Sequence, residues 1–141
     1  MTPAGPSPHL YWIELACKDG TPYPMIWRST RALILAKEFE AFRHLCGDRP
    51  LEVLSAFRTP EWNRRVGGAS NSQHVHGRAL DILKPTNFTL EQFWNMAHAY
   101  AMTSDSGLYG LGRYPWGVHL DIRPANRLAV WNGSRPEADN G

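Results

Sequence analysis

Cysteine is scarce in this sequence, and its two cysteines form no recognisable pair. Cys17 and Cys46 lie far apart, without the Cys-x-x-Cys spacing that redox motifs and cysteine zinc knuckles use. Two cysteines are also too few for the several disulfides that staple a small secreted domain. The sequence therefore excludes a disulfide framework and favours two buried or half-buried free thiols.

Long apolar runs are also absent. No stretch approaches the about 18 to 20 apolar residues that a transmembrane helix needs. Residues 1–8 hold three prolines and lack the basic start and apolar core of a secretory signal. We therefore expect a chain that is made in the cytoplasm without a signal peptide and that has no membrane span.

An excess of charge of one sign is missing as well. Fifteen Lys and Arg against 13 Asp and Glu leave a net charge of +2, too small to indicate a nucleic-acid partner or an anionic membrane surface. The hydrophobic content of 43% and charged content of 20% are ordinary for a soluble globular protein. The length of 141 residues predicts one domain over 1–141, with an irregular lead at 1–8 and a frayed tail at 132–141.

Hydrophobic periodicity and turn chemistry predict the order of the elements. Helices are expected from a Ser29 or Thr30 cap to about residue 46, after Thr59-Pro60, and from the Thr89-x-x-Gln92 capping box to about residue 102. Strands are expected at 51–56, 78–83, 107–114, 117–123 and 128–131, with a short strand or strap at 10–15. This order predicts an α+β fold, a small and mostly antiparallel sheet with helices packed on one side.

One stretch, residues 72–82, carries two potential metal ligands. His74 and Asp81 are seven positions apart, and Gly77 between them allows a sharp turn because glycine has no Cβ to forbid positive φ. In the strand that follows, Leu80 and Ile82 share one face and Asp81 lies on the other. A loop histidine and a strand aspartate can therefore converge on one point.

A second stretch, residues 117–123, supplies a third ligand. His119 and Asp121 alternate with apolar residues, which indicates a strand with one apolar and one polar face. Two histidines and one carboxylate form a donor set that suits zinc. Three protein ligands leave a fourth position for water, which is the catalytic arrangement rather than the structural one. We therefore predict a zinc site of His74, Asp81 and His119 in a cleft on the sheet.

Each histidine alone could be a surface or hydrogen-bonded residue, but the combined pattern is more specific. Ser-x-His-x-x-Gly-x-Ala-x-Asp followed by a strand His-x-Asp resembles the zinc D-alanyl-D-alanine carboxypeptidase superfamily of peptidoglycan peptidases. Residues 55–63, Ser-Ala-Phe-Arg-Thr-Pro-Glu-Trp-Asn, strengthen the likeness. The chain is most similar to the short stand-alone bacterial and phage members, and the superfamily also resembles the vancomycin-resistance dipeptidases, some phage endolysins and the hedgehog domain.

The resemblance implies a zinc metallopeptidase that hydrolyses peptidoglycan stem peptides, as a D,D-carboxypeptidase or an endopeptidase. It implies His74, Asp81 and His119 as zinc ligands. Arg58, at a strand-to-helix junction, is a surface arginine on the plainest reading. The resemblance makes it a contact for the substrate carboxylate or the developing oxyanion. Ser72 and His76, on either side of His74, are predicted with Arg58 as substrate-binding residues.

The sequence departs from the relatives at the general base. Several relatives have Asp or Glu three residues before the last zinc histidine, or His two before it, where this chain has Trp116 and Gly117. Asp121 is the natural replacement, either as the catalytic base or as the partner that orients a ligand histidine. His76 is a second candidate for the base.

Two functions follow from these observations. The first is an active wall-degrading peptidase; without an export signal, it would reach the cell wall through phage lysis, as an endolysin, or as part of a virion. The second is a zinc-stabilised binding or structural module of the same fold, which the hedgehog likeness and the missing upstream carboxylate both permit. A catalytic arrangement of ligands favours the enzyme.

Overall fold

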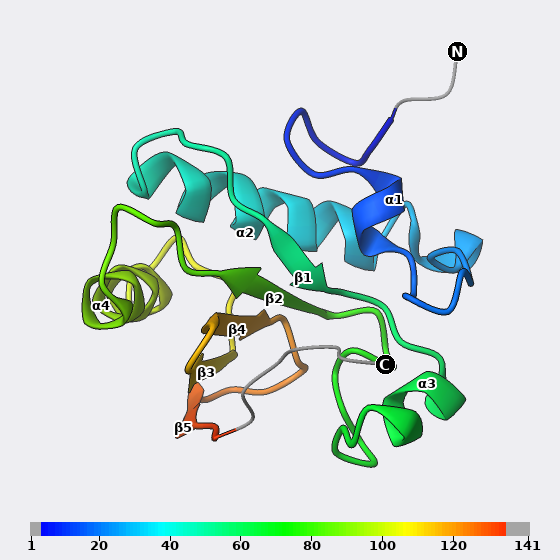
Figure 1. Cartoon of the computed structure of the whole chain (residues 1–141). Helices are drawn as coiled ribbons and strands as arrows, with labels where there is room; N and C mark the ends of the chain where they lie inside the picture. The colour runs from blue at the N-terminus through cyan, green and yellow to red at the C-terminus, as the bar shows by residue number, and fades with distance from the viewer. Residues whose placement is uncertain (1–3, 135–141) are drawn as a thin grey trace.

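The computed structural model describes residues 4–134 as one sheet with helices around it (Figure 1). The helical elements are α1 (Trp12–Leu15), the 3-10 turn η1 (Met25–Trp27), α2 (Arg31–Leu45), α3 (Pro60–Arg65) and α4 (Leu90–Ala101). The strands are β1 (Val53–Ser55), β2 (Ala79–Leu83), β3 (Gly110–Tyr114), β4 (Gly117–Asp121) and β5 (Ala129–Asn132). The strand order is β1-β2-β4-β3-β5, antiparallel except for the β3–β5 pair, so the predicted α+β fold is confirmed.

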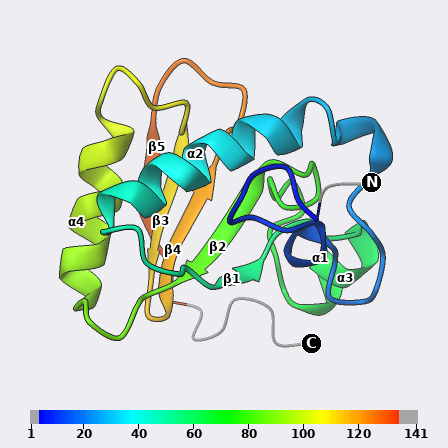
Figure 2. The same ribbon diagram turned by 90° about the horizontal axis from the view of Figure 1, so that it is seen from above.

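The apolar face of the sheet forms the core with α2 and α4. Leu80 and Ile82 of β2 and Val118 and Leu120 of β4 are at most 1% exposed. Phe39 and Phe42 of α2 and Phe93 of α4 are fully buried in the same cluster. Figure 2 shows α2 running across the sheet, with α4 beside it. Because side chains alternate along a strand, the residues between these apolar positions face away from α2.

The register of the central strands brings polar residues of that second face together. Asp81 of β2 lies directly opposite His119 of β4, and Ala79 lies opposite Asp121. On the other side of β4, Gly112 lies opposite His119 and Gly110 opposite Asp121. The sheet therefore places the Asp81 and His119 side chains next to each other without any loop being needed.

Two helices begin where the sequence predicts, through their caps. Thr89 Oγ1 accepts a hydrogen bond from the Gln92 amide at 3.0 Å, and Gln92 Oε1 accepts one from the Thr89 amide at 2.9 Å. Thr59 Oγ1 accepts from the Trp62 amide at 3.1 Å. α2 also begins after Thr30, but the Thr30 side chain does not cap it. Its hydroxyl points back to the Trp27 carbonyl at 3.5 Å.

The predictions for the two ends of the chain differ in outcome: one is wrong, and one lies mostly outside the described residues. Within residues 10–15, predicted as a short strand or strap, residues 12–15 form helix α1, and Glu14 accepts a hydrogen bond from the Tyr11 amide at 3.0 Å at its start. Asn132 ends β5, while residues 135–141 of the predicted tail lie outside the described residues. Over residues 4–134, no helix combines the length and apolar character needed to cross a bilayer.

The two cysteines are free thiols inside the fold. Cys17 is 3% exposed and Cys46 is 1% exposed. Burial raises the pKa of both thiols, that of Cys46 to about 11, which disfavours the reactive thiolate. We predict that Ellman's reagent labels neither cysteine in the native protein at pH 8 within minutes and labels both in denaturant. Rapid labelling of the native chain would contradict the core arrangement.

Candidate metal centre

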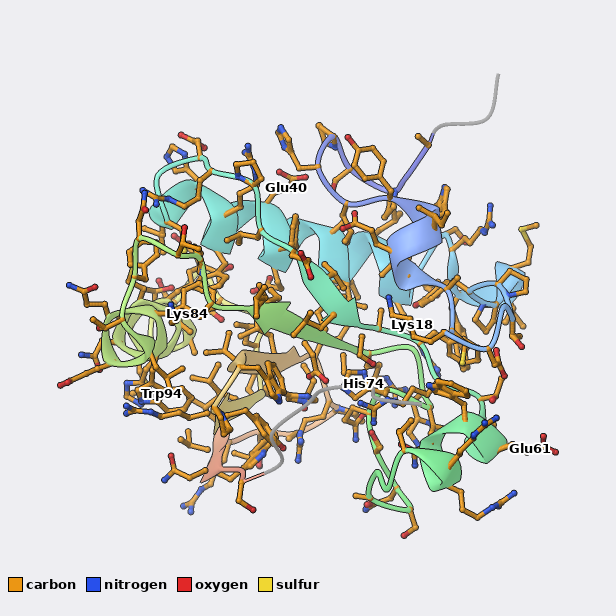
Figure 3. All side chains as sticks on the ribbon, in the orientation of Figure 1. Lys18, Glu40, Glu61, His74, Lys84 and Trp94 are labelled. Atoms are coloured by element: carbon orange, nitrogen blue, oxygen red, sulfur yellow. The ribbon has the colours of Figure 1, made fainter. Side chains whose placement is uncertain are left out.

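Three side chains from two separate segments converge on the polar face of the sheet. Asp81 Oδ1 lies 3.1 Å from His74 Nε2 and 2.9 Å from His119 Nδ1. One donor atom from each residue lies within 4.8 Å of the others, and all three residues are buried. Figure 3 shows His74 on the side of the sheet away from α2, between the strands and α3.

The backbone fixes the orientation of the His74 ring. Its Nδ1 donates a hydrogen bond to the Ala56 carbonyl at 2.6 Å, which leaves Nε2 facing Asp81 as the free donor atom. The His74 carbonyl accepts from the Arg58 amide at 3.1 Å, and Ser72 Oγ accepts from the His74 amide at 3.2 Å. The loop that carries His74 is thus hydrogen-bonded to residues 56–58, which follow β1, through both the backbone and the side chain of His74.

The turn after His74 depends on Gly77. Gly77 has φ +66°, and a Cβ there would lie 2.6 Å from the Trp27 ring. The Gly77 carbonyl accepts from the Tyr23 hydroxyl at 2.7 Å. Glycine is therefore required by conformation and by space, and the N-terminal segment holds the loop from outside.

A second carboxylate orients the His119 ring. His119 Nε2 donates to Asp121 Oδ2 at 2.7 Å, which turns Nδ1 toward Asp81. Asp121 is fully buried, and a Cβ at Gly110 would overlap its carboxylate. The glycine of β3 therefore provides the space that the orienting carboxylate occupies.

Burial and mutual contacts set the pKa values of the three converging groups. Burial raises the pKa of Asp81, but its charge attraction to His74 and hydrogen bonds from His119 and His74 outweigh burial and hold the pKa far below the usual range. Burial lowers the pKa of His74 despite the nearby Asp81. Burial also acts to lower the pKa of His119, but hydrogen bonds to Asp121 and Asp81 raise it to about 9.

This donor set fits zinc. Zinc is bound by imidazole nitrogens and carboxylate oxygens, and catalytic zinc sites have three protein ligands. Both imidazoles have one nitrogen committed to a hydrogen-bond acceptor and the other facing Asp81, as metal-binding histidines do. The structure thus contains a His-Asp-His site suited to zinc, as the sequence predicts.

The site opens into a pocket of about 320 Å³. Its lining combines the three candidate ligands, polar residues of the loop before β2 and aromatic residues of the β3–β5 region. These residues are Arg58, Gly68, Ala69, Asn71, Ser72, Gln73, His74, Asp81, Tyr114, Trp116, His119, Arg123 and Trp131. Volume and lining are suited to a small organic or peptide ligand.

Arg58 lines the pocket but is not a surface arginine. It is 2% exposed, and its guanidinium contacts Ser55 Oγ at 3.2 Å, Asn63 Oδ1 at 3.1 Å and Asp81 Oδ2 at 3.5 Å. The first role that the structure gives Arg58 is therefore to compensate the buried Asp81 carboxylate. Its position in the pocket wall also leaves it beside any bound ligand.

The structure places the two other predicted substrate contacts, Ser72 and His76, differently relative to the pocket. Ser72 lines the pocket, whereas His76 is exposed and does not. The chain turns between His74 and Gly77, and the His76 carbonyl accepts from Arg31 of α2 at 2.7 Å. The same turn that brings His74 in leaves His76 outside the residues that line the pocket, and its contact with substrate stays a prediction.

The structure adds an aromatic wall that the sequence does not reveal. Tyr114 and Trp116 are stacked with ring centroids 4.8 Å apart, and Trp131 packs against His119 at 5.1 Å. Trp131 comes from β5, whose parallel pairing with β3 has no local sequence signal. Arg123, in contrast, shares the alternation of His119 and Asp121, so the sequence pattern could have indicated it.

The two loop histidines allow a matched test of the metal site. We predict that His74→Ala lowers zinc affinity by more than the about 10- to 100-fold that loss of an outer-shell partner costs. His76→Ala, two residues away and outside the pocket, should bind zinc like the unchanged chain. Competition with a chromophoric chelator measures both. Equal loss in the two variants would contradict the assignment.

Zinc affinity should also depend on pH through His119. Below its pKa of about 9 this imidazole is protonated in the metal-free protein, and the proton must leave before a metal can bind. We predict that zinc affinity, corrected for the chelator, falls about tenfold per pH unit as pH decreases below 9. Asp121→Asn should shift the start of this fall to lower pH, since it removes one carboxylate that raises the pKa. A fall that begins only below about pH 6.5, the ordinary histidine value, would contradict this reading.

Comparison with known proteins supports this site. Residues 8–121, which contain all three converging side chains, match the family described as peptidase M15. Over 51 residues the chain is 45% identical to a zinc D-Ala-D-Ala carboxypeptidase of Streptomyces albus G; the aligned part is 36% of this chain and about a fifth of the length of that relative. The family match covers most of the chain and all three converging side chains, and the chain belongs to the peptidase M15 family.

Proposed function

We propose that the protein is a zinc metallopeptidase that hydrolyses peptide bonds of peptidoglycan stem peptides next to D-alanine. The observation that carries the proposal is the convergence of His74, Asp81 and His119 at the wall of a pocket. Membership of the peptidase M15 family supports peptide hydrolysis. The similarity to the Streptomyces zinc D-Ala-D-Ala carboxypeptidase supports zinc and a D-alanyl substrate.

In this proposal the three converging residues hold zinc. Bound there, zinc would polarise the scissile carbonyl and lower the pKa of a water ligand to about 7. His74 and His119 would bind through the nitrogens that face Asp81, because their other nitrogens are hydrogen-bonded to Ala56 and Asp121. Asp81 would complete the set and keep the charge of the site near +1.

The contacts of Asp121 favour the orienting role over that of general base. Both of its oxygens accept hydrogen bonds, Oδ2 from His119 and Arg123 and Oδ1 from Arg123, and the residue is fully buried. A general base must reach the proton that it removes. Asp121 would instead hold the neutral His119 ring with Nε2–H donated and Nδ1 available.

Arg58 and the aromatic wall supply the features that a stem peptide needs. Arg58 is the cation beside Asp81 in the pocket wall, and a substrate carboxylate or a developing oxyanion would be attracted to it. Ser72 lines the same side, and Tyr114 and Trp116 offer apolar surface for short alkyl side chains such as that of alanine. Both carboxypeptidase and endopeptidase action fit this arrangement.

We further propose a route to the substrate. The likeness of its motifs to those of short bacterial and phage members supports delivery to the bacterial cell wall through phage-induced lysis or as part of a virion. Its partner there would be peptidoglycan, without a nucleic-acid partner. Expression from a lysis or tail gene cluster would support this context, whereas constitutive export by a host would contradict it.

One observation favours a second function, a zinc-stabilised binding module without turnover. Within residues 4–134, Asp81 is the only carboxylate that lines the pocket, and Trp116 occupies the position where several of the resembled relatives carry an acid. A site without a second carboxylate can bind zinc and peptide yet hydrolyse slowly. The same experiment distinguishes the two functions.

We predict that the purified protein loaded with zinc releases D-alanine or cleaves cross-links in muropeptides, as detected by mass spectrometry. Removal of zinc with a chelator should abolish cleavage, and added zinc should restore it. His119→Ala should lose activity by more than about a hundredfold. His44→Ala, a change of an exposed histidine on α2, should retain it. Bound zinc and bound peptide without cleavage would support the binding module instead.

A further inference from the structure

Two residues beyond the family match contact the metal centre. The match ends at Asp121, whereas Arg123 follows β4 and Trp131 lies in β5. Both line the pocket. Arg123 binds Asp121, which orients His119, and Trp131 packs against the His119 ring. We propose that Arg123 is a positioning residue. It holds Asp121 and Trp131 against two sides of the His119 ring and so sets the zinc affinity of the site. This inference rests on the proposed zinc site.

The first contact is a two-point ion pair. Arg123 Nε donates to Asp121 Oδ1 at 2.9 Å and Nη2 donates to Oδ2 at 2.8 Å, while the Arg123 backbone amide adds a bond to Oδ1 at 3.1 Å. Such bidentate pairing fixes the plane of a carboxylate. That plane directs Oδ2 to His119 Nε2 at 2.7 Å, so the guanidinium sets the direction in which the imidazole can donate.

The ion pair between Arg123 and Asp121 is important because the Asp121 carboxylate is buried. The Asp121 side chain is 0% exposed, whereas the Arg123 side chain is 29% exposed. If Arg123 were removed, a buried carboxylate would keep His119 as its only side-chain partner within the described residues. Without Arg123, fewer contacts would hold the plane of the Asp121 carboxylate and, with it, the direction of the His119 imidazole. Arg123 therefore both compensates the buried charge of Asp121 and keeps the ring in place.

The second contact passes through Trp131. The Arg123 guanidinium lies over the Trp131 ring at 5.1 Å, and the Trp131 ring packs against His119 with centroids 5.1 Å apart. The indole Nε1 donates to the Tyr114 hydroxyl at 3.0 Å. Trp131 thus covers the exposed side of the His119 ring and is itself held at two points.

Glycine in β3 makes this contact across strands possible. Gly112 pairs with His119 on one side and with Trp131 on the other. A Cβ at Gly112 would lie 2.6 Å from Trp131 Nε1. With no side chain between them, the imidazole and the indole meet over β3, so the last strand forms part of the metal centre.

The test measures metal binding and not only activity. In the full-length chain, Arg123→Ala should weaken zinc binding by about 10- to 100-fold, as loss of an outer-shell partner does. Arg123→Lys keeps the charge but not the two-point geometry, and it should recover part of that loss. Arg127→Ala, an exposed arginine four residues further on, makes the same change in charge and should bind zinc normally.

Two readouts separate positioning from a general loss of structure. The visible spectrum of the Co²⁺-substituted protein reports ligand geometry, and it should change in Arg123→Ala but not in Arg127→Ala. If Arg123 acts through Asp121, then Asp121→Asn and the double variant Asp121→Asn/Arg123→Ala should bind zinc within about threefold of each other. Circular dichroism of the metal-free variants checks the fold, and Arg123→Lys serves if Arg123→Ala does not fold.

The outcomes distinguish this inference from the proposed function. Unchanged zinc affinity and an unchanged Co²⁺ spectrum in both Arg123 variants would overturn the positioning role while leaving the zinc peptidase intact. Additive losses in the double variant would overturn the route through Asp121. Failure of the unchanged chain to bind zinc would overturn the zinc site and this inference together.

Discussion

The antiparallel pairing of β2 with β4 is the constraint on which the rest of the site depends. It places Asp81 directly opposite His119 on the face of the sheet away from α2. On the other face, Leu80, Ile82, Val118 and Leu120 form the core, so the register that buries the apolar side chains also fixes the polar pair. A slip by one residue would turn every side chain to the wrong face. The same strand register therefore determines both the burial of the core and the geometry of the metal centre.

Around this pair, each ring is held by a group that is not a candidate ligand. The Ala56 carbonyl orients His74, Asp121 orients His119, and Arg58 compensates Asp81. These partners come from the segment after β1 and from β4, the two neighbours of β2 in the sheet. The metal centre is therefore preorganised by main-chain pairing and by buried ion pairs rather than by a flexible loop.

The sequence predicts those parts of this arrangement that follow from local patterns, namely side-chain alternation along strands and the capping residues of helices. Alternation in two strands predicted which residues face the core and which face the metal, and the caps at Thr59 and Thr89 predicted two helix starts. Residues 10–15, which contain α1, were predicted as a short strand or strap because apolar composition alone does not distinguish a helix from a strand over so few residues. The exposed position of His76 and the place of Trp131 in the pocket wall were not predicted, for a different reason. The direction of a side chain in a tight turn, and the parallel pairing of β5 with β3, depend on contacts between distant parts of the chain.

The glycines of β3 limit how this pocket can be altered. At Gly110 and Gly112 any added side-chain atom would collide with the Asp121 carboxylate or the Trp131 indole. These two positions can therefore contribute no specificity, whether through natural variation or in a designed library. New substrate preferences would have to come from Tyr114, Trp116 and the loop before β2, which border the pocket without filling the space beneath the imidazole. Laboratory evolution of the protein should keep these two glycines and randomise the residues that border the pocket.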